Sequence, residues 1–473
     1  MNTKALRQKI LDLAIHGKLV PQDPNDEPAS VLLERIRDEK ERLIKEGKIK
    51  RPKKTKTTSD KPHYENVPFE VPSSWAWTTV GEISQSILYG VSESAKSRGT
   101  YRLLRITDIQ DNTVNWNTVP FTDYEDERAE AYLLEYGDIL FARTGATVGK
   151  SYLVNNLQEK AIYASYLIRV KTSHYVLPEF VKYFFESGFY WEQVLGNSVG
   201  IGQPNVNGTI LSNLELPIPP IMEQKRIVKE LGKWLSIIDK IEESKGRLQK
   251  VISLAKSKVL DLAIHGKLVP QYPTDEPATE LLKRINPKAE ITSDNGHYQK
   301  LPEGWCETQL GDIFNHNTGK ALNSSNTEGT LKDYLTTSNV YWNSFDFSVI
   351  KKMLFKESEL NKCQITKGDL LVCEGGDIGR AAIWDYDYDI CIQNHLHRLR
   401  PKVNGICVSF YYYVLYYLKI NNMIGGKGIG LLGLSSNALH KLHVPFPPLN
   451  EQHRIVAKIE EIFAQLDAID ASL

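Results

Sequence analysis

One stretch of the chain has the spacing of a cofactor-binding loop. Gly428, Gly430 and Gly433 form a G-x-G-x-x-G sequence, the pattern that holds the phosphates of a dinucleotide when it joins a strand to a helix. That use needs a surrounding βαβ unit, which the flanking sequence does not offer. A related stretch at Gly200 and Gly202 has Asn205 in place of the third glycine. We therefore interpret these glycines as loop residues.

Two proline clusters faintly resemble the [D/N]-P-P-[Y/F] motif with which adenine methyltransferases hold their target base. They read P-I-P-P at residues 217–220 and P-F-P-P at residues 445–448, without the leading amide or acid. Both lead directly into a helical pattern, so we interpret them as stiff joints between a domain and a helix. The phosphate-binding sequence G-x-x-x-x-G-K-[ST] does not occur. We expect no catalysis by this chain, and no S-adenosylmethionine, ATP, Mg²⁺ or other metal bound to it.

Cys391, His395 and His397 carry the side-chain types of a transition-metal site. The positions that correspond to them in an internal repeat, described below, include two isoleucines, which cannot bind a metal. Alternation along a strand explains the pattern better than a metal site does. His16 and His265 each precede a glycine in the last turn of a predicted helix, where an imidazole suits the helix dipole, so we expect structural roles for them.

Side chains that can read DNA bases occur in the predicted loops. Arginine pairs with guanine, asparagine and glutamine pair with adenine, and glutamate accepts from cytosine. The candidates in the first half of the chain are Lys96, Arg98, Arg102, Arg105, Arg143, Thr144, Lys150, Gln203 and Asn205. Those in the second half are Lys320, Asn339, Glu374, Arg380, Asn394 and His395. The same residue types also occupy ordinary surface loops. A basic run from Lys45 to Lys61 has two interpretations, a phosphate grip and a solvated linker.

The composition limits the class of protein. A chain of 473 residues is too long for one ordinary core and predicts two to four domains. Its formal net charge of zero favours neither nucleic acid nor membrane, so any basic surface must be local. The five cysteines show no C-x-x-C spacing, and the N-terminus lacks the apolar core of a signal peptide. We expect free thiols and a cytoplasmic protein.

An internal repeat carries the candidate residues. The sequence L-D-L-A-I-H-G-K-L-V-P-Q occurs at residues 11–22 and again, unchanged, at residues 260–271. The stretch G-D-I-L-F-A-R-T-G at residue 137 answers G-D-L-L-V-C-E-G-G at residue 368, which aligns Arg143 with Glu374 within one residue. The stretch P-I-P-P-I-M-E-Q-K-R-I-V at residue 217 answers P-F-P-P-L-N-E-Q-H-R-I-V at residue 445. Nearly the whole chain is two copies of one unit, whose helices agree and whose loops diverge.

Each copy ends in a long helix after its proline cluster. Apolar residues there recur in steps of three and four, which predicts a coiled-coil seam. The seam residues are Ile227, Leu231, Trp234, Ile238, Ile241, Leu248, Ile252, Ala255, Val259 and Leu262. The second copy adds Ile455, Ile459, Ile462, Leu466, Ile469 and Leu473, and the first helix of the chain adds Leu6, Ile10 and Leu13.

These elements predict an α+β fold. Two globular α/β domains are joined by two long antiparallel coiled-coil helices, in a pseudo-twofold cyclic tandem repeat. The chain ends in the repeat almost where it begins, so the first helix is expected to continue the last. The predicted segments are an N-terminal helical region and linker (1–65), a first domain (66–220), a central long helix and linker (221–296), a second domain (297–448) and a C-terminal helix (449–473).

The tandem motifs L-D-L-A-I-H-G-K-L-V-P-Q, G-D-I-L-x-x-R-x-G-x-x-G and P-[IF]-P-P-[IL]-x-E-Q-x-R-I-V resemble those of type I restriction-modification specificity subunits, over essentially the whole chain. The second copy departs from the second motif at Glu374, where the first copy has Arg143. The resemblance implies that each globular domain is a target-recognition domain for one half of a bipartite, asymmetric site in double-stranded DNA. It implies that the helices act as a spacer and bind two modification subunits, which hold S-adenosylmethionine and methylate adenine. Two restriction subunits with ATP-driven activity are further possible partners.

Two other classes of protein stay as alternatives. A self-contained adenine-specific methyltransferase or restriction enzyme component needs a cofactor loop and a catalytic acid or amide, and the sequence offers neither convincingly. A coiled-coil scaffold without a DNA function would not need two globular domains that have diverged in their loops.

Overall fold

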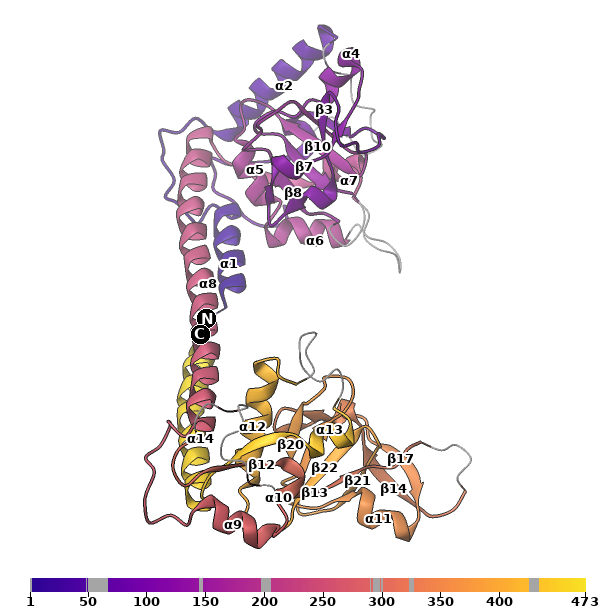
Figure 1. Ribbon diagram of the computed structural model, residues 1–473. Helices are drawn as coiled ribbons and strands as arrows, with labels where there is room; N and C mark the ends of the chain where they lie inside the picture. The colour runs from indigo at the N-terminus through magenta and orange to yellow at the C-terminus, as the bar shows by residue number, and fades with distance from the viewer. Residues whose placement is uncertain are drawn as a thin grey trace. The chain divides into compact units, whose positions relative to one another are not determined.

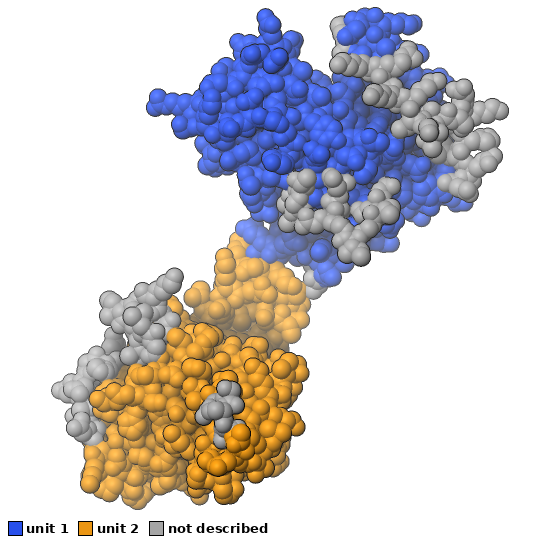
Figure 2. All heavy atoms as spheres, turned by 90° about the vertical axis from the view of Figure 1, so that its right-hand side faces the viewer, with its two compact units in different colours: residues 1–244 blue, residues 245–473 orange. Residues whose placement is uncertain are grey.

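The chain folds into two compact units, residues 1–244 and residues 245–473 (Figure 2). The computed structural model describes residues 2–47, 49, 67–143, 148–196, 206–289, 291, 298, 301–322, 327–424 and 434–473. Within these ranges no helix is long and apolar enough to cross a bilayer. Each unit holds one copy of the sequence repeat.

The first unit combines a globular domain with the first part of a long helix (Figure 1). Its helices are α1 (Thr3–Ile15), α2 (Ala29–Lys45), α3 (Val80–Ile83), α4 (Asp126–Ala129), α5 (Pro178–Phe184), α6 (Gly188–Gly196), α7 (Gly208–Asn213) and the beginning of α8 (Ile221–Ile264). Its strands are β1 (Ala76–Thr79), β2 (Ser84–Tyr89), β3 (Tyr101–Leu104), β4 (Ile109–Gln110), β5 (Thr113–Val114), β6 (Phe121–Thr122), β7 (Ile139–Ala142), β8 (Ser151–Leu153), β9 (Ala161–Tyr163), β10 (Leu167–Thr172) and β11 (Glu215–Ile218).

An antiparallel sheet of order β2-β10-β7-β8 forms the centre of this domain. All four residues of β7 are buried, which is why this strand reads as a continuous apolar run instead of an alternating one. The ring of Phe141 on β7 packs edge-on against Phe185 at the end of α5, with the ring centres 4.5 Å apart. A sheet of order β6-β3-β9 and the pairs β1-β11 and β4-β5 complete the domain.

The second unit contains the end of α8 and a second globular domain. Its other helices are α9 (Ala278–Ile285), α10 (Leu310–Ile313), α11 (Glu357–Cys363), α12 (Val408–Ile420), α13 (Ser436–His440) and α14 (Leu449–Ser472). Its strands are β12 (Cys306–Gln309), β13 (Phe314–Thr318), β14 (Thr330–Leu335), β15 (Val340–Tyr341), β16 (Ser344–Phe345), β17 (Lys351–Phe355), β18 (Gln364–Ile365), β19 (Leu370–Cys373), β20 (Ala381–Ile383), β21 (Ile390–Ile392), β22 (Leu396–Pro401) and β23 (His443–Phe446).

The two domains have the same topology. The order β13-β22-β19-β20 corresponds to β2-β10-β7-β8, and the order β17-β14-β21 corresponds to β6-β3-β9. In the second sheet of each domain, β3 or β14 has one parallel neighbour, β9 or β21. The second domain adds β18 beside β21. This agreement confirms that the repeat in the sequence is a repeat of the fold.

Backbone hydrogen bonds also fix the register that the sequence left open by one residue. The amide of Arg143 donates to the carbonyl of Tyr166 at 3.0 Å, and the amide of Glu374 donates to the carbonyl of His395 at 2.9 Å. The preceding residues, on β7 and β19, pair with the first residues of β10 and β22. Arg143 and Glu374 therefore occupy equivalent positions.

The repeated E-Q-x-R motif forms the joint between each domain and its long helix. At the start of α14, Glu451 accepts hydrogen bonds from the indole of Trp305 at 2.9 Å and from the amide of Gln271 at 3.1 Å. Arg454 forms an ion pair with Asp275 at 2.7 Å. Burial raises the pKa of Glu451, and these donors offset part of that effect.

The same joint occurs at the start of α8. Gln22 donates to Glu223 at 2.7 Å, and Arg226 pairs with Asp26 at 2.5 Å. The fully buried side chain of Gln224 accepts from the backbone amide of Leu177 and donates to a carbonyl in the proline cluster. The proline clusters thus lead into a hydrogen-bonded corner, in agreement with their interpretation as joints.

The L-V-P-Q motif reaches this joint because the helix before it stops at a glycine. Gly17 follows α1 with φ of +67°, a left-handed conformation in which a side chain is strained. A Cβ atom at this position would also lie 2.5 Å from the ring of Pro72. The Nδ1–H of His16 donates to the carbonyl of Asp12, 2.7 Å away, so this histidine has the expected structural role.

Each long helix has an antiparallel neighbour in its own unit. In the first unit, α1 runs against the beginning of α8: Arg7 pairs with Asp239, while the chain beyond α1 meets Glu223 through Gln22. In the second unit, Lys256 near the end of α8 pairs with Asp467 of α14. Antiparallel helix contacts were expected from the sequence.

The buried face of α8 differs from the predicted seam. Ile227, Leu231 and Ile238 are buried as expected, but Trp234 is 43% exposed, and Leu235 is buried instead. The prediction for Trp234 was therefore wrong, as it was for Leu248, which is also exposed. The domain packs against the same helix as α1, so the apolar face is wider than a two-helix seam and includes Leu235.

We predict that Leu235→Ala lowers the free energy of unfolding of the isolated chain by about 2 kcal/mol or more, because it leaves a cavity in the core. The adjacent Trp234→Ala should cost less, about 1 kcal/mol, because this residue is 43% exposed and lies outside the core. Urea unfolding followed by circular dichroism measures both. Equal losses would contradict the observed helix face and support the heptad seam.

Candidate nucleic-acid interface

The candidate DNA-reading residues do not form one cluster, but in each domain one of them, Arg143 or Glu374, directly follows a hairpin strand. In the first domain, Arg143 directly follows β7, and its guanidinium lies over the ring of Tyr89, 5.2 Å from the ring centre. The Tyr89 hydroxyl accepts a hydrogen bond from the amide of Gly208 at 2.8 Å, which fixes the ring. Tyr166, which pairs with Arg143 through the backbone, is 61% exposed. This group combines a cation with accessible aromatic rings.

Two other arginines of the first domain hold its own backbone. Arg102 forms two hydrogen bonds to the carboxylate of Glu159, at 2.9 and 3.1 Å, and a third to the carbonyl of Val119. Arg105 binds Asp108 with its guanidinium and its backbone amide, which caps the short 3-10 helix η1 (Ile106–Asp108). Arg102 is mostly buried, so a DNA contact by this side chain would have to replace its hydrogen bonds to Glu159 and Val119. Arg105 is partly exposed in spite of its bonds to Asp108.

The remaining candidates of the first domain are at the surface or outside the described residues. Lys96 pairs with Asp123 at 3.0 Å, and Arg98 and Lys150 are exposed. Thr144, Gln203 and Asn205 lie outside the described residues, as does the basic run beyond Lys45, apart from Glu46, Gly47 and Ile49. Both glycine-rich stretches, residues 200–205 and 428–433, also lie outside them.

In the second domain, two candidates are engaged in the fold. Asn339 is 4% exposed and donates both amide hydrogens, to the carbonyls of Asp346 and Val349. Lys320 donates to the carboxylate of Glu359 at 2.6 Å and to a backbone carbonyl. Both side chains stabilise loops of the domain, and a base contact by Asn339 would require that loop to open.

The other four candidates of the second domain lie close together. The imidazole of His395 is 3.9 Å from the carboxylate of Glu374, and both side chains reach solvent. The amide of Asn394 donates to the carbonyl of Lys320, which ties this turn to the neighbouring strand. Arg380, on the other arm of the same hairpin, donates to the backbone carbonyl of Thr337 at 2.6 Å.

Aromatic residues beside these cations were missed in the sequence. The guanidinium of Arg380 lies 4.7 Å from the ring centre of Tyr341, which is 44% exposed, much as Arg143 lies over Tyr89. The sequence shows these tyrosines and arginines, but each tyrosine is far from its arginine along the chain. Only the tertiary structure brings the two side chains together. An aromatic ring under a guanidinium orients it and leaves its outer N–H groups available.

The alternative metal site does not form around Cys391. Among the described residues no group of three ligands could hold a metal. Cys391 is buried in a small cluster with Tyr334, and His397 is fully buried between His316, 3.0 Å away, and the carbonyl of Leu434. His395 is exposed in the turn between β21 and β22. The prediction of alternation along one strand was wrong, because Cys391 lies on β21 and His397 on β22.

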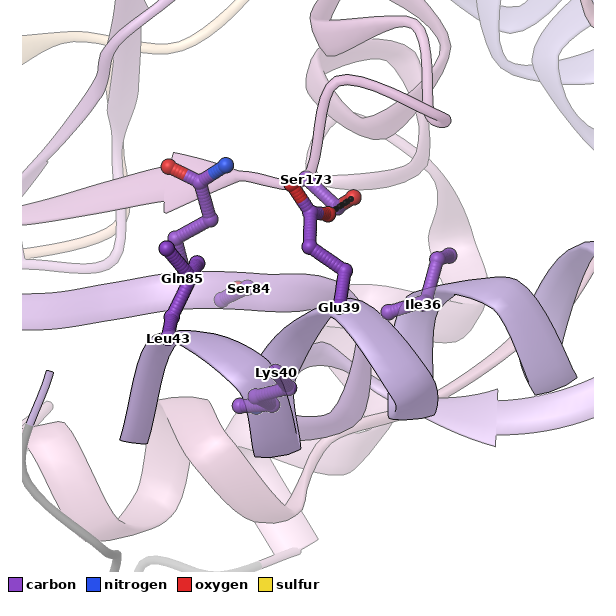
Figure 3. A pocket seen from close by; sticks show the side chains of 7 residues that line it. All are labelled: Ile36, Glu39, Lys40, Leu43, Ser84, Gln85 and Ser173. Atoms are coloured by element: carbon purple, nitrogen blue, oxygen red, sulfur yellow. Dashed lines mark hydrogen bonds between the residues drawn. The ribbon is translucent and has the colours of Figure 1, made fainter. Parts of the chain in front are cut away.

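A small hollow lies where α2 meets the first domain, and it is lined by Ile36, Glu39, Lys40, Leu43, Ser84, Gln85 and Ser173 (Figure 3). Its cavity volume of about 10 Å³ is close to what one water molecule needs and far below that of ordinary ligand pockets. Ser173 donates to Glu39 at 3.0 Å, and the amine of Lys40 donates to the carbonyl of Gly81. Burial lowers the pKa of Lys40. This hollow is a packing seam that fastens α2.

Comparison with known proteins gives a consistent result. The family model described as "Type I restriction modification DNA specificity domain" matches residues 72–251 and 302–471. The chain is 28% identical to the type I restriction enzyme EcoAI specificity subunit of Escherichia coli, over 97% of this chain and 88% of that protein. It is 24% identical to the putative type I restriction enzyme MjaX specificity subunit of Methanocaldococcus jannaschii, over 83% of this chain and 88% of that protein.

One solved structure is similar in fold. It is described as "Structural basis underlying complex assembly and conformational transition of the type I R-M system", and the matching chain has a TM-score of 0.58 at 20% identity. The match covers 86% of this chain and 94% of that chain.

We predict a pH dependence of stability from the histidine pair in the second domain. Burial, His397 and His440 lower the pKa of His316 to about 4. The unfolded chain therefore takes up a proton near pH 6.5 that the folded chain does not, so the free energy of unfolding should fall as the pH drops from about 6.5 towards 4. Each such proton contributes at most about 1.4 kcal/mol per pH unit.

His316→Ile tests this, because the position equivalent to His316 by strand register is Ile87. Urea midpoints at about pH 7 and about pH 5 should differ less in His316→Ile than in the wild type. His453→Asn, at an exposed position on α14, is the control and should keep the wild-type difference. The same difference in His316→Ile would exclude this histidine as its source.

Proposed function

Because the chain belongs to the family of type I restriction-modification DNA specificity domains, we propose that it selects the DNA sequence on which such a complex acts. The family model matches twice, once in each half of the chain, so we assign one half of a bipartite target to each domain. The observation that carries this proposal is the duplication itself. One fold occurs twice with different side chains at equivalent hairpin positions, such as Arg143 and Glu374.

The proposed partner is double-stranded DNA, read at the two hairpin ends. In the first domain we assign contacts to Arg143 and to the exposed Arg98 and Lys150. In the second domain we assign them to Glu374 and His395, which reach solvent side by side. Because the formal net charge is zero, we propose that other subunits supply much of the non-specific attraction to DNA.

We further propose two modification subunits as partners on the long helices. α8 leaves Trp234 and Ile237 exposed in the first unit, and Val251 and Leu254 exposed in the second. Apolar side chains that recur on one exposed helix suit a protein partner. S-adenosylmethionine, ATP and Mg²⁺ would then be bound by partner subunits, in the cytoplasm, and this chain would carry out no catalysis of its own.

We propose that the helices pair as an antiparallel coiled coil that gives the two domains a pseudo-twofold relation. Within each unit the support is the antiparallel contact of α8 with α1 or with α14. A two-fold arrangement would present one adenine on each strand to one modification subunit.

The central test exchanges residues 72–216 for the equivalent domain of a related subunit. With the modification subunits present, the methylated sequence should change in one half-site and stay the same in the other, because each domain has its own core. Mapping methylated adenines in a random DNA library measures this. A simultaneous change of both half-sites would contradict the assignment of one domain to each.

The purified chain alone, incubated with S-adenosylmethionine and the same library, is the control for catalysis. It should transfer no methyl group. Methylation by the chain alone would instead support the alternative of a self-contained methyltransferase.

A second prediction concerns the distance between the half-sites. One heptad inserted near Glu242 and another near the equivalent Asp470 should lengthen the helical spacer by about 10 Å, close to three base pairs. The preferred gap in the methylated sequence should lengthen, while both half-sites stay the same. A heptad in only one helix should weaken binding at every gap. An unchanged gap in the doubly extended protein would exclude the helices as the ruler.

A further inference from the structure

The two domains place side chains of opposite charge at one equivalent backbone position. Arg143 and Glu374 each follow the last residue of a buried hairpin strand, β7 or β19. Each donates its backbone amide to the residue that precedes the neighbouring strand, Tyr166 or His395. The backbone is therefore held alike in both domains, and only the side chain that it presents differs.

The supporting structure beneath this position is constant. Arg169 on β10 donates to two backbone carbonyls at 2.7 and 2.9 Å, and the equivalent Arg398 on β22 donates to two at 2.6 and 3.0 Å. Both arginines are buried. A residue that only stabilised the hairpin would be expected to stay the same as these do, so the reversal of charge at 143 and 374 points to a role outside the hairpin.

The side chain of Arg143 is oriented but not saturated. Its guanidinium lies over Tyr89, whose hydroxyl is held by the amide of Gly208. Its Nε atom is buried without a hydrogen-bond partner among the described residues. A guanidinium whose outer N–H groups are not engaged offers a pair of donors, which matches O6 and N7 of guanine in the major groove.

Glu374 offers the complementary chemistry. Its carboxylate is about one-third exposed and has His395 as a neighbour at 3.9 Å. A carboxylate can accept a hydrogen bond from the N4 amino group of cytosine, and it repels the phosphate backbone. A glutamate at the position of a phosphate-binding arginine would weaken DNA binding, whereas a glutamate at a base-reading position would select a different base.

We propose that positions 143 and 374 are matching base-reading positions: Arg143 recognises a guanine in one half-site, and Glu374 recognises a cytosine in the other. This rests on the proposed function, and it assigns a specific base contact to one residue in each domain. Tyr89 is the positioning residue, because its ring lies under the Arg143 guanidinium.

The test uses the full chain with its modification subunits and maps methylated adenines in a random DNA library. Arg143→Gln and Glu374→Gln introduce the same side chain, which favours adenine. Each should change the preferred base at one position of its own half-site, with discrimination against the wrong base altered by about 5- to 150-fold. Arg128→Gln and Glu357→Gln, at exposed positions on α4 and α11, are matched controls and should leave the sequence unchanged.

Tyr89 variants separate positioning from folding. Tyr89→Leu removes the ring, and it should reduce the preference for guanine at the Arg143 position without changing the other half-site. Tyr89→Phe keeps the ring and should restore most of that preference. The unchanged half-site in each variant reports that the complex is folded and active.

Three results would overturn the inference. The first is an unchanged half-site in Arg143→Gln with normal activity, and the second is a uniform loss over all sequences, which marks a phosphate contact. The third is a change in the half-site read by the other domain. A wild-type complex with no bipartite methylated sequence would instead overturn the proposed function, so the two failures are distinguishable.

Discussion

The fold depends on a buried polar joint at which each domain meets its long helix. A glutamate in the first turn of the helix accepts from a glutamine of the L-V-P-Q motif, and one turn on an arginine pairs with an aspartate. Removing one partner of such a buried set leaves a desolvated charge, which costs more than the net value of the bond. The constraint acts on Glu223 and Glu451 alike, and it explains why these motifs recur almost unchanged.

This joint lets the domains diverge elsewhere. The fully buried glutamine of the motif ties the helix to the domain through backbone groups, at the amides of Leu177 and Cys407, so it places no demand on nearby side chains. Buried arginines such as Arg169 and Arg398 likewise bind carbonyls of the main chain. With its frame held by backbone contacts, each domain can change the residues at its hairpin end without losing its core.

A protein that reads two different half-sites needs such a division between frame and reading surface. The chain has a formal net charge of zero, so any basic surface is local. Two candidate side chains are oriented by aromatic rings, Arg143 by Tyr89 and Arg380 by Tyr341. The exposed apolar residues of α8 leave a second surface, distinct from the hairpin ends, for the protein partners that the proposed function requires.

The repeat, the two-domain organisation and the family could be predicted from the sequence, because identical motifs at fixed offsets impose the same local structure twice. The glycine that ends α1 and the proline joints could also be predicted from the sequence, because the backbone conformation at these places depends on one or two residues. The face of α8 was not: Leu235 is buried and Trp234 exposed because a domain, and not only a second helix, packs on α8. Nor could composition tell Asn339, which holds a loop, from Glu374, which reaches solvent. Both are polar loop residues in the sequence, and only the contacts made between distant segments decide which hydrogen bonds each side chain has already formed.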